Sequence, residues 1–413
     1  MLTRYTLLLA LCAPLWIGAQ GTVKNISITS PALGTQEALQ IYLPEGYDSA
    51  GTITYPVVYF LHGATFNFAS YTCLIDSVKA LISSGEIQPM ILVKPNGSQG
   101  FYLGSMYTNS SVNGNVEDCI INDVIGYIDT HYKTKADPQH RCIFGHSMGA
   151  MGSAYLGMKY SAKFRAFASI SGEMDFSQFG LFFNVVLASD YPGGPPYTYD
   201  PGKLLTGLVY TAAAGYSPDP NDAQFVEFPL DAQGNMLPNV MAKWSAFDPV
   251  RLASKLPAGS DLGVYFDCGQ QDEFNFYPIN LSFRDSLNAF GISYIFRSFQ
   301  GGHTNKICER MPLALRYLDS LMQVPVVAAP EAPASERLIL YPNPASDEIT
   351  LRLGADDLPR QVEIFDGEGR RALARSVSGS TAGVNISSLL SGAYMIKVVG
   401  PDGVRVGKLM KRR

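Results

Sequence analysis

Residues 141–160 read RCIFGHSMGAMGSAYLGMKY, and this stretch decides the fold. A short apolar run is followed by G-H-S-M-G at 145–149 and then by a helical pattern. A sharp turn between a buried strand and a helix lifts its serine above the edge of the sheet. In this position the motif G-x-S-x-G indicates a nucleophilic serine. The turn leaves almost no room for side chains two residues before and after the serine, where the chain has Gly145 and Gly149. The pattern predicts that Ser147 is a nucleophile.

Further apolar strand runs alternate with helical patterns on both sides of this stretch. In chain order they are YPVVYFLHG (55–63), MILVKPNG (90–97), FRAFASISG (164–172), LGVYFDCG (262–269) and ISYIFRSF (292–299). Strands that are apolar on both faces and separated by helices predict a doubly wound, mostly parallel α/β sheet. Residues 173–249 break the rhythm, because they are rich in Gly, Pro, Phe and Tyr without a regular period. Such a long insertion is either a lid or binding wall, or an irregular surface excursion.

An activated serine requires a histidine as base and a carboxylate that orients it. Elimination among the five histidines leaves His303, in the GGHT motif directly after the last strand run. The expected chain order is Ser, acid, His, and VYFDCGQQDEF offers Asp267, Asp272 and Glu273. We prefer Asp272, because it follows a glycine turn at the carboxyl edge of the sheet. Asp267 lies within the apolar strand and is the second choice.

Backbone N–H groups must stabilise the oxyanion that forms when the serine attacks. The candidate donors are Met148, directly after the nucleophile, and Ala64, after the LHG turn. Three side chains are candidates for substrate binding. His62 shapes the loop after an early strand, His146 is the variable residue of the serine turn, and Trp244 belongs to a group of aromatic residues that would line an acyl pocket or fill the core.

Composition bounds the class of protein. The chain has 413 residues, of which 46% are hydrophobic and 16% charged, so disordered, collagen-like and coiled-coil proteins are excluded. A net charge of -5 gives no electrostatic reason to expect a nucleic acid as partner. No Cys or His spacing resembles a metal site, and no cofactor is expected.

The first 19 residues have a basic residue, an apolar core and a small-residue end, which is typical of a secretory signal peptide. Lipidation at Cys12 is disfavoured because Leu11 precedes it. No other stretch approaches the roughly 18 apolar residues of a membrane span. Five cysteines remain after the signal, and we expect one or two disulfides at most, with a pairing that sequence cannot give: Cys73, Cys119, Cys142, Cys268 and Cys308.

A Pro- and Ala-rich linker at 323–335 separates a catalytic domain at 20–322 from a C-terminal domain at 336–413. In the C-terminal domain, apolar and polar residues alternate around two Asp-Gly turns. This pattern predicts a small antiparallel β-sandwich that folds separately.

The catalytic part resembles the esterase D branch of the α/β-hydrolases, which includes feruloyl esterases, S-formylglutathione hydrolases and the antigen 85 mycolyltransferases. The resemblance covers residues 38–322, through LHGAT, YTNSS with GNVED, YIDTHYKT, GHSMGA, SGEMDF, CGQQDEF and GGHT. It implies the α/β-hydrolase fold, and the triad and oxyanion donors of the family fall on the residues assigned above.

The C-terminal part resembles the sorting domain of the type IX secretion system, through YPNPASDEITL, SGAYMIKV and the basic end at 408–413. This resemblance implies export across the outer membrane of a Gram-negative bacterium, with the type IX machinery as partner and a secreted or surface-attached product. The alternative is a carbohydrate-binding sandwich.

The sequence therefore predicts a secreted serine carboxylesterase that forms an acyl-enzyme. Its substrates would be short-chain acyl or aryl, feruloyl-type esters, either small molecules or linked to polysaccharide. Three alternatives remain: an acyltransferase of the mycolyltransferase type that uses a sugar hydroxyl as acceptor, a non-catalytic surface binding protein, and a peptidase.

Overall fold

The computed structural model describes residues 21–257, 259–323, 338–353, 359–366, 371–400 and 403–412. The chain divides into two compact units, Met1–Val324 and Pro325–Arg413, which are described separately here. The expected signal peptide at 1–19 lies outside the described residues, as does the expected linker except for Gln323.

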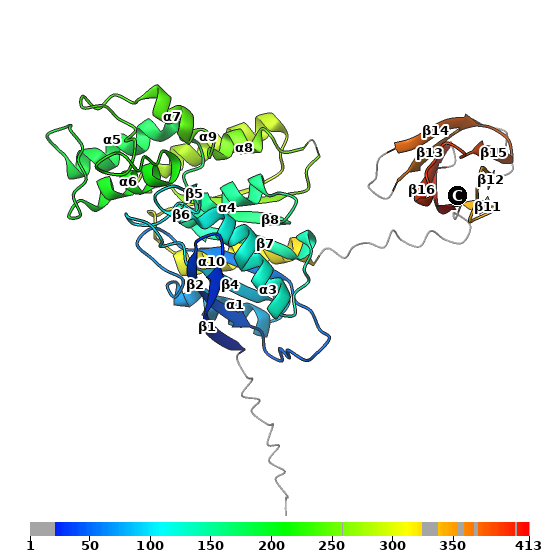
Figure 1. Ribbon diagram of the computed structural model, residues 1–413, viewed down its shortest axis with the longest axis horizontal. Coiled ribbons are helices and arrows are strands. Elements are labelled where there is room, and N and C mark those ends of the chain that lie inside the picture. Colours follow the sequence, from blue (N-terminus) through cyan, green and yellow to red (C-terminus); the bar gives the residue numbers. More distant parts are fainter. Residues whose placement is uncertain are drawn as a thin grey trace, which may run out of the picture. The chain divides into compact units, whose positions relative to one another are not determined.

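An eight-stranded sheet forms the centre of the first unit (Figure 1). Across the sheet the strands are β1 (Thr22–Ser30), β2 (Thr35–Leu43), β4 (Ile91–Pro95), β3 (Val57–Leu61), β7 (Arg141–His146), β8 (Ala166–Ile170), β9 (Gly263–Gly269) and β10 (Ile295–Phe299). The β1–β2 and β2–β4 pairs are antiparallel, and the other neighbours are parallel. This arrangement confirms the predicted α/β-hydrolase fold class.

Alternate residues of a strand point to opposite faces of the sheet. Since the central strands are apolar on both faces, helices cover both. Val58 and Phe60 of β3 pack into a core with the helices α1 (Thr72–Ser83) and α10 (Ile307–Met322). The other β3 residues, such as Tyr59, pack into a second core on the opposite face. The helices of that face are α2 (Val116–Asp118) with its π-helical continuation (Cys119–Val124), α3 (Ile125–His131), α4 (Met148–Lys159) and α9 (Phe276–Phe290). Two short paired strands, β5 (Asn109–Ser110) and β6 (Gly114–Asn115), directly precede α2.

The insertion at 173–249 differs from the expected irregular segment. It contains α5 (Phe179–Asp190), α6 (Leu204–Tyr216) and α7 (Pro238–Trp244), and α8 (Pro249–Ala253) follows directly. Figure 1 shows α5, α6 and α7 gathered on one side of the sheet. The sequence pattern hides α5 and α6 because they carry apolar residues around most of their circumference, which leaves no amphipathic period.

One disulfide joins Cys73, in the first turn of α1, to Cys308, in the first turn of α10. Cys119, Cys142 and Cys268 are buried free thiols. Within the part of the chain that the structure describes, no helix is both long and apolar enough to cross a membrane.

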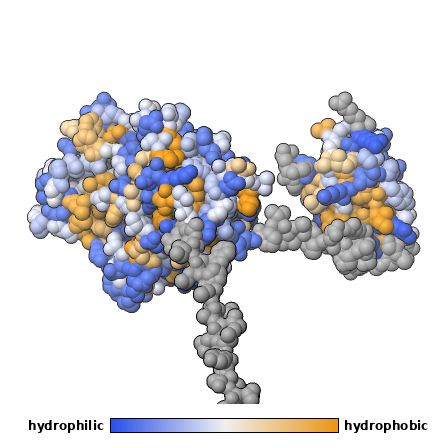
Figure 2. Space-filling view, turned by 90° about the horizontal axis from the view of Figure 1, so that it is seen from below, coloured by the Kyte–Doolittle hydropathy of each residue, from blue (hydrophilic) through white to orange (hydrophobic). Residues whose placement is uncertain are grey.

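The second unit consists of two antiparallel sheets around its own core. One sheet contains β11 (Ile339–Tyr341), β12 (Glu348–Arg352) and β15 (Thr381–Asn385), and the other contains β14 (Arg371–Val377), β13 (Arg360–Phe365), β16 (Gly392–Gly400) and β17 (Gly403–Lys411). Ile349 of β12 and Val362 of β13 belong to the same buried cluster, so the two sheets enclose a single core. Apolar side chains such as Tyr341, Leu390 and Met395 are nevertheless exposed, and Figure 2 shows hydrophobic residues on the surface of this unit.

Candidate active site

Ser147 occupies a strained turn between β7 and α4. Its φ of 56° and ψ of -122° place a non-glycine residue in a sparsely populated region of backbone space. A Cβ atom on Gly145 would lie 2.2 Å from the carbonyl oxygen of Gly149, and one on Gly149 would lie 2.0 Å from the carbonyl oxygen of Leu61. Both positions therefore require glycine, as the sequence pattern implies.

The structure brings the three proposed triad residues together at the carboxyl ends of three parallel strands. Ser147 follows β7, Asp272 follows β9 and His303 follows β10. His303 Nε2 lies 2.9 Å from Ser147 Oγ, and His303 Nδ1 lies 2.8 Å from Asp272 Oδ2. Both distances are within hydrogen-bond range. This is the arrangement in which a carboxylate orients an imidazole that can take the proton of a serine.

Neighbouring groups hold the histidine and its carboxylate in place. Asp272 Oδ1 accepts a hydrogen bond from the backbone N–H of Phe274 at 3.0 Å. The backbone N–H of His303 donates to Glu273 Oε2 at 2.6 Å. The rings of Phe274 and Phe276 pack edge-on against the imidazole, with centroids 4.6 and 5.5 Å away. The imidazole can therefore rotate little out of line with the serine.

Asp267, the second choice for the acid, serves a different neighbour. Its carboxylate is buried and forms an ion pair with Arg310, in α10. Arg310 also donates to Ser171 Oγ at 2.7 Å and to the carbonyl oxygen of His303 at 3.3 Å. Burial raises the pKa of Asp267, and the arginine opposes that shift. Sequence reasoning missed Arg310, because only the folded chain shows that it donates a hydrogen bond to the backbone of the loop that carries His303.

Ser147 opens into a narrow cavity. Besides the serine, the lining residues are Ala64, Met106, Met148, Glu173, Phe179, Phe182, Leu208, Thr211, Ala212, Tyr216, Phe274 and Phe276. The space open to water is about 20 Å³, which is close to the room that one water molecule needs. The two candidate oxyanion donors, Ala64 and Met148, both belong to this wall. Met148 is the first residue of α4, so its N–H has no partner within the helix.

His62 and His146 are not among the residues that line this cavity. The imidazole of His62 joins two loops of the chain. Its Nδ1 lies 2.8 Å from the carbonyl oxygen of Gly63, and its Nε2 accepts a hydrogen bond from the N–H of Gly97 at 2.8 Å. Burial lowers the pKa of His62 to about 4, which keeps it neutral. His146 Nδ1 lies 2.9 Å from the hydroxyl of Tyr71, and burial also lowers its pKa.

Trp244 also lies behind the cavity wall rather than in it. Its ring is fully buried and packs edge-on against Phe179 and Phe183. Its Nε1–H donates to Ser217 Oγ at 2.8 Å. Trp244 therefore packs against Phe179, a residue of the cavity wall, without lining the cavity itself.

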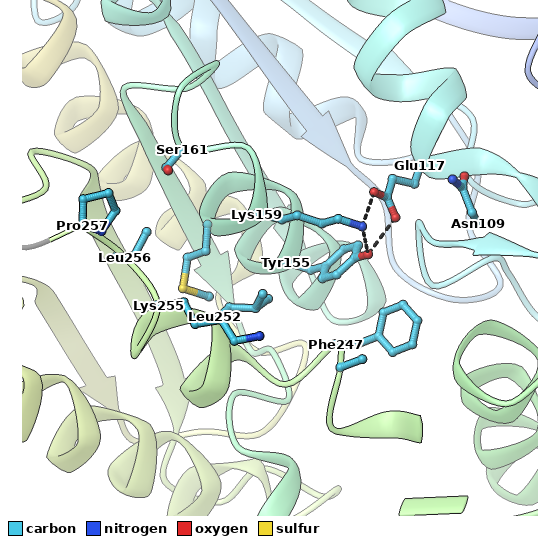
Figure 3. Close-up of a pocket in the computed structure, with 12 residues that line it drawn as sticks. Asn109, Glu117, Tyr155, Lys159, Ser161, Phe247, Leu252, Lys255, Leu256 and Pro257 are labelled. Carbon is cyan, nitrogen blue, oxygen red and sulfur yellow. Dashed lines mark hydrogen bonds and ion pairs between the residues drawn. The ribbon is translucent and has the colours of Figure 1, made fainter. Parts of the chain in front are cut away.

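A wider cavity of about 560 Å³ lies at the other end of α4 (Figure 3). The cavity is lined by the buried carboxylate of Glu117, which lies 2.7 Å from the hydroxyl of Tyr155 and 2.5 Å from Lys159 Nζ. Because these groups satisfy one another and no histidine lines the cavity, its size does not make it the site of ester chemistry. Among the described residues, no group of three or more His, Cys, Asp and Glu side chains is placed to hold a metal ion.

Comparison with known proteins gives two family matches. A family described as "Putative esterase" matches residues 30–307, and the secretion system C-terminal sorting domain matches residues 339–412.

Among curated proteins, an endo-1,4-beta-xylanase/feruloyl esterase of Xylanibacter ruminicola is 28% identical over 162 residues, which are 37% of this chain and 22% of that protein. An esterase of Mycobacterium tuberculosis is 27% identical over 151 residues, which are 36% of this chain and 32% of that protein. The chain thus spans less than a third of the length of either relative. A solved ferulic acid esterase is similar in fold, with a TM-score of 0.55 and 20% identity over 74% of this chain and 99% of that one.

Proposed function

Because the chain belongs to this esterase family, we propose that it is an ester-cleaving serine hydrolase, a secreted carboxylesterase whose triad is Ser147, His303 and Asp272. The observation that carries the proposal is the hydrogen-bonded series from Ser147 Oγ through the imidazole to the Asp272 carboxylate. The C-terminal sorting domain indicates a secreted or cell-surface protein that the type IX system handles.

The geometry supports a two-step reaction. Ser147 Oγ attacks the ester carbonyl carbon while His303 Nε2 takes the hydroxyl proton, and Asp272 stabilises the resulting imidazolium. The N–H groups of Ala64 and Met148 stabilise the oxyanion. His303 then gives its proton to the departing alkoxide, which leaves an acyl-serine. Water, deprotonated by the same imidazole, hydrolyses this ester and restores the enzyme.

The size and lining of the cavity favour the short-chain members of the substrate class. The space beside Ser147 is water-sized, and the surrounding wall carries bulky side chains such as Phe179 and Phe182. An acetyl group needs the least additional space, whereas an octanoyl or feruloyl group requires much larger movements of the phenylalanines. The feruloyl esterase activity in the names of the relatives keeps aryl esters within the proposed range.

The test is hydrolysis of p-nitrophenyl esters from acetyl to octanoyl by the wild-type protein and by Ser147→Ala. We expect turnover that falls with acyl length, and a loss of about 10⁴-fold or more in the variant, because the oxyanion hole and binding alone leave little catalysis. A fluorophosphonate probe should label the wild type only. Ser161→Ala, in the wider cavity, is the matched control and should behave as wild type. Full turnover by Ser147→Ala would refute the proposal.

A further inference from the structure

Two polar groups in the wall of the catalytic cavity lack a hydrogen-bond partner among the described residues. They are Glu173 Oε2 and the hydroxyl of Tyr216, and both atoms are buried. The other polar side chains of the wall are already engaged. Ser147 bonds to His303, and Thr211 donates to a helix carbonyl at 2.7 Å and accepts a backbone N–H at 3.1 Å.

Burying an unpaired carboxyl oxygen and an unpaired hydroxyl costs the folded state free energy. Apolar neighbours such as Phe179, Phe182 and Met106 make up much of the wall and offer neither group a partner. Burial, together with the charge of Asp272, raises the pKa of Glu173 to about 7. Since buried polar groups are nearly always satisfied, two open groups that share one cavity with the nucleophile point to a ligand that satisfies both.

We propose that Glu173 and Tyr216 form a subsite that binds a hydroxyl group of the ester substrate. A hydroxyl both donates and accepts, so it can donate to Glu173 Oε2 and accept from the Tyr216 hydroxyl. An alkyl group would leave both protein groups unpaired. This inference rests on the proposed esterase function, because it concerns the cavity beside Ser147.

The position of the two residues explains how such a preference would arise. Glu173 follows β8 at the start of the long insertion, and Tyr216 is the last residue of α6 within it. The proposed catalytic residues all follow strands of the sheet, whereas one member of this subsite, Tyr216, comes from a helix of the insertion. The water-sized space favours a hydroxyl on a short acyl chain, such as a 2- or 3-hydroxyacyl group, over the phenolic hydroxyl of a hydroxycinnamoyl group.

The experiment measures kcat/KM for matched pairs of esters with the full chain. The first pairs are methyl butyrate with its 2-hydroxy and 3-hydroxy derivatives, and a further pair is methyl cinnamate with methyl 4-hydroxycinnamate. For the wild type we expect a preference of about tenfold or more for a hydroxylated butyrate, since a site built to bind a hydroxyl discriminates against the analogue without it. Glu173→Leu and Tyr216→Phe should each bring that ratio to about one. Glu45→Leu, at an exposed position, is the control and should keep the wild-type ratio.

Equal rates within every pair for the wild type, or an unchanged preference in Glu173→Leu, would overturn the subsite. A preference seen only with the cinnamate pair would overturn the short hydroxyacyl assignment. Fluorophosphonate labelling of each variant shows whether Ser147 is still in a folded, reactive site, so a misfolded variant is recognised. Tyr216→Phe removes only one oxygen atom and therefore tests the subsite with the smallest change to the fold. If the wild type neither reacts with the probe nor cleaves any ester, the esterase proposal itself fails. Normal labelling and hydrolysis without any hydroxyl preference would remove the subsite alone.

Discussion

At the scale of single residues, two aspartates on one short segment have different neighbours. Asp272 contacts the imidazole of His303, and Asp267 pairs with the buried Arg310. Asp272→Asn should lower kcat for p-nitrophenyl acetate by about 10³- to 10⁴-fold with little change in stability, because the imidazole then adopts the wrong tautomer. Asp267→Asn should instead lower the free energy of unfolding by about 3–5 kcal/mol, because it leaves a buried arginine without its counter-ion. Urea unfolding and steady-state kinetics distinguish the two effects, and the reverse pattern would exchange the roles of the aspartates.

Glu173 makes stability depend on pH in a specific direction. Its pKa in the folded chain is about 7, against an ordinary value of 4.5. Below pH 4.5 the carboxyl is protonated in both states, and stability falls as the pH rises towards 7, because the unfolded chain ionises first. Glu173→Gln does not titrate, so its unfolding free energy relative to wild type should increase by about 1–3 kcal/mol between pH 4.5 and pH 8. Urea unfolding at the two pH values measures this increase, and a difference that does not change with pH would contradict the expected pKa.

Sequence reasoning reaches some of these residues and not others, for a physical reason. Ser147 and its two glycines follow a local rule, since backbone crowding in the turn forbids other side chains. His303 emerges because few histidines exist and only one follows a late strand. The significance of Glu173 and Arg310 depends on what the fold places beside them, and no local pattern carries that information. The same limit applies to His62, His146 and Trp244: none of them lines the cavity beside Ser147, and their part in substrate binding stays a prediction.

At the scale of elements, the disulfide between α1 and α10 anchors the segment that follows His303, the proposed catalytic histidine. Cys308 lies five residues after His303, and the bridge to Cys73 spans 235 residues of chain. Replacing both cysteines by serine should lower the free energy of unfolding by about 2–4 kcal/mol, because the unfolded chain regains the entropy of an open loop. It should also lower kcat, since the histidine loop loses an anchor. Non-reducing unfolding experiments and ester kinetics check both effects, and identical stability with and without a reductant in the wild type would contradict them.

The predicted elements show how far periodicity alone carries. The buried parallel strands are evident because short runs apolar on both faces occur in the centre of such a sheet. The outer strands β1 and β2 did not emerge, since their mixed polar and apolar residues belong to the antiparallel edge. Helices α5 and α6 escaped detection because they are apolar on nearly all sides, and only tertiary packing distinguishes such a helix from an irregular core segment.

At the scale of the whole molecule, the two units have separate hydrophobic cores. A protein that ends at residue 323 should therefore fold and hydrolyse p-nitrophenyl acetate with a kcat/KM within about twofold of the full chain, because domains with their own cores fold as units. Thermal unfolding and kinetics of both forms measure this. A truncated protein that is insoluble or inactive would show that the C-terminal unit is needed for the catalytic unit to fold. The exact domain boundaries remain a prediction.

The long insertion begins after β8 and ends before β9, which are adjacent parallel strands of the sheet. Its point of departure and its point of return are thus both fixed by the same rigid pair of strands. This segment can be lengthened, shortened or replaced between its two fixed ends, while the serine, histidine and aspartate stay where the other loops place them. The segment that would select the ester can therefore differ in length and sequence without moving the residues proposed to react with it.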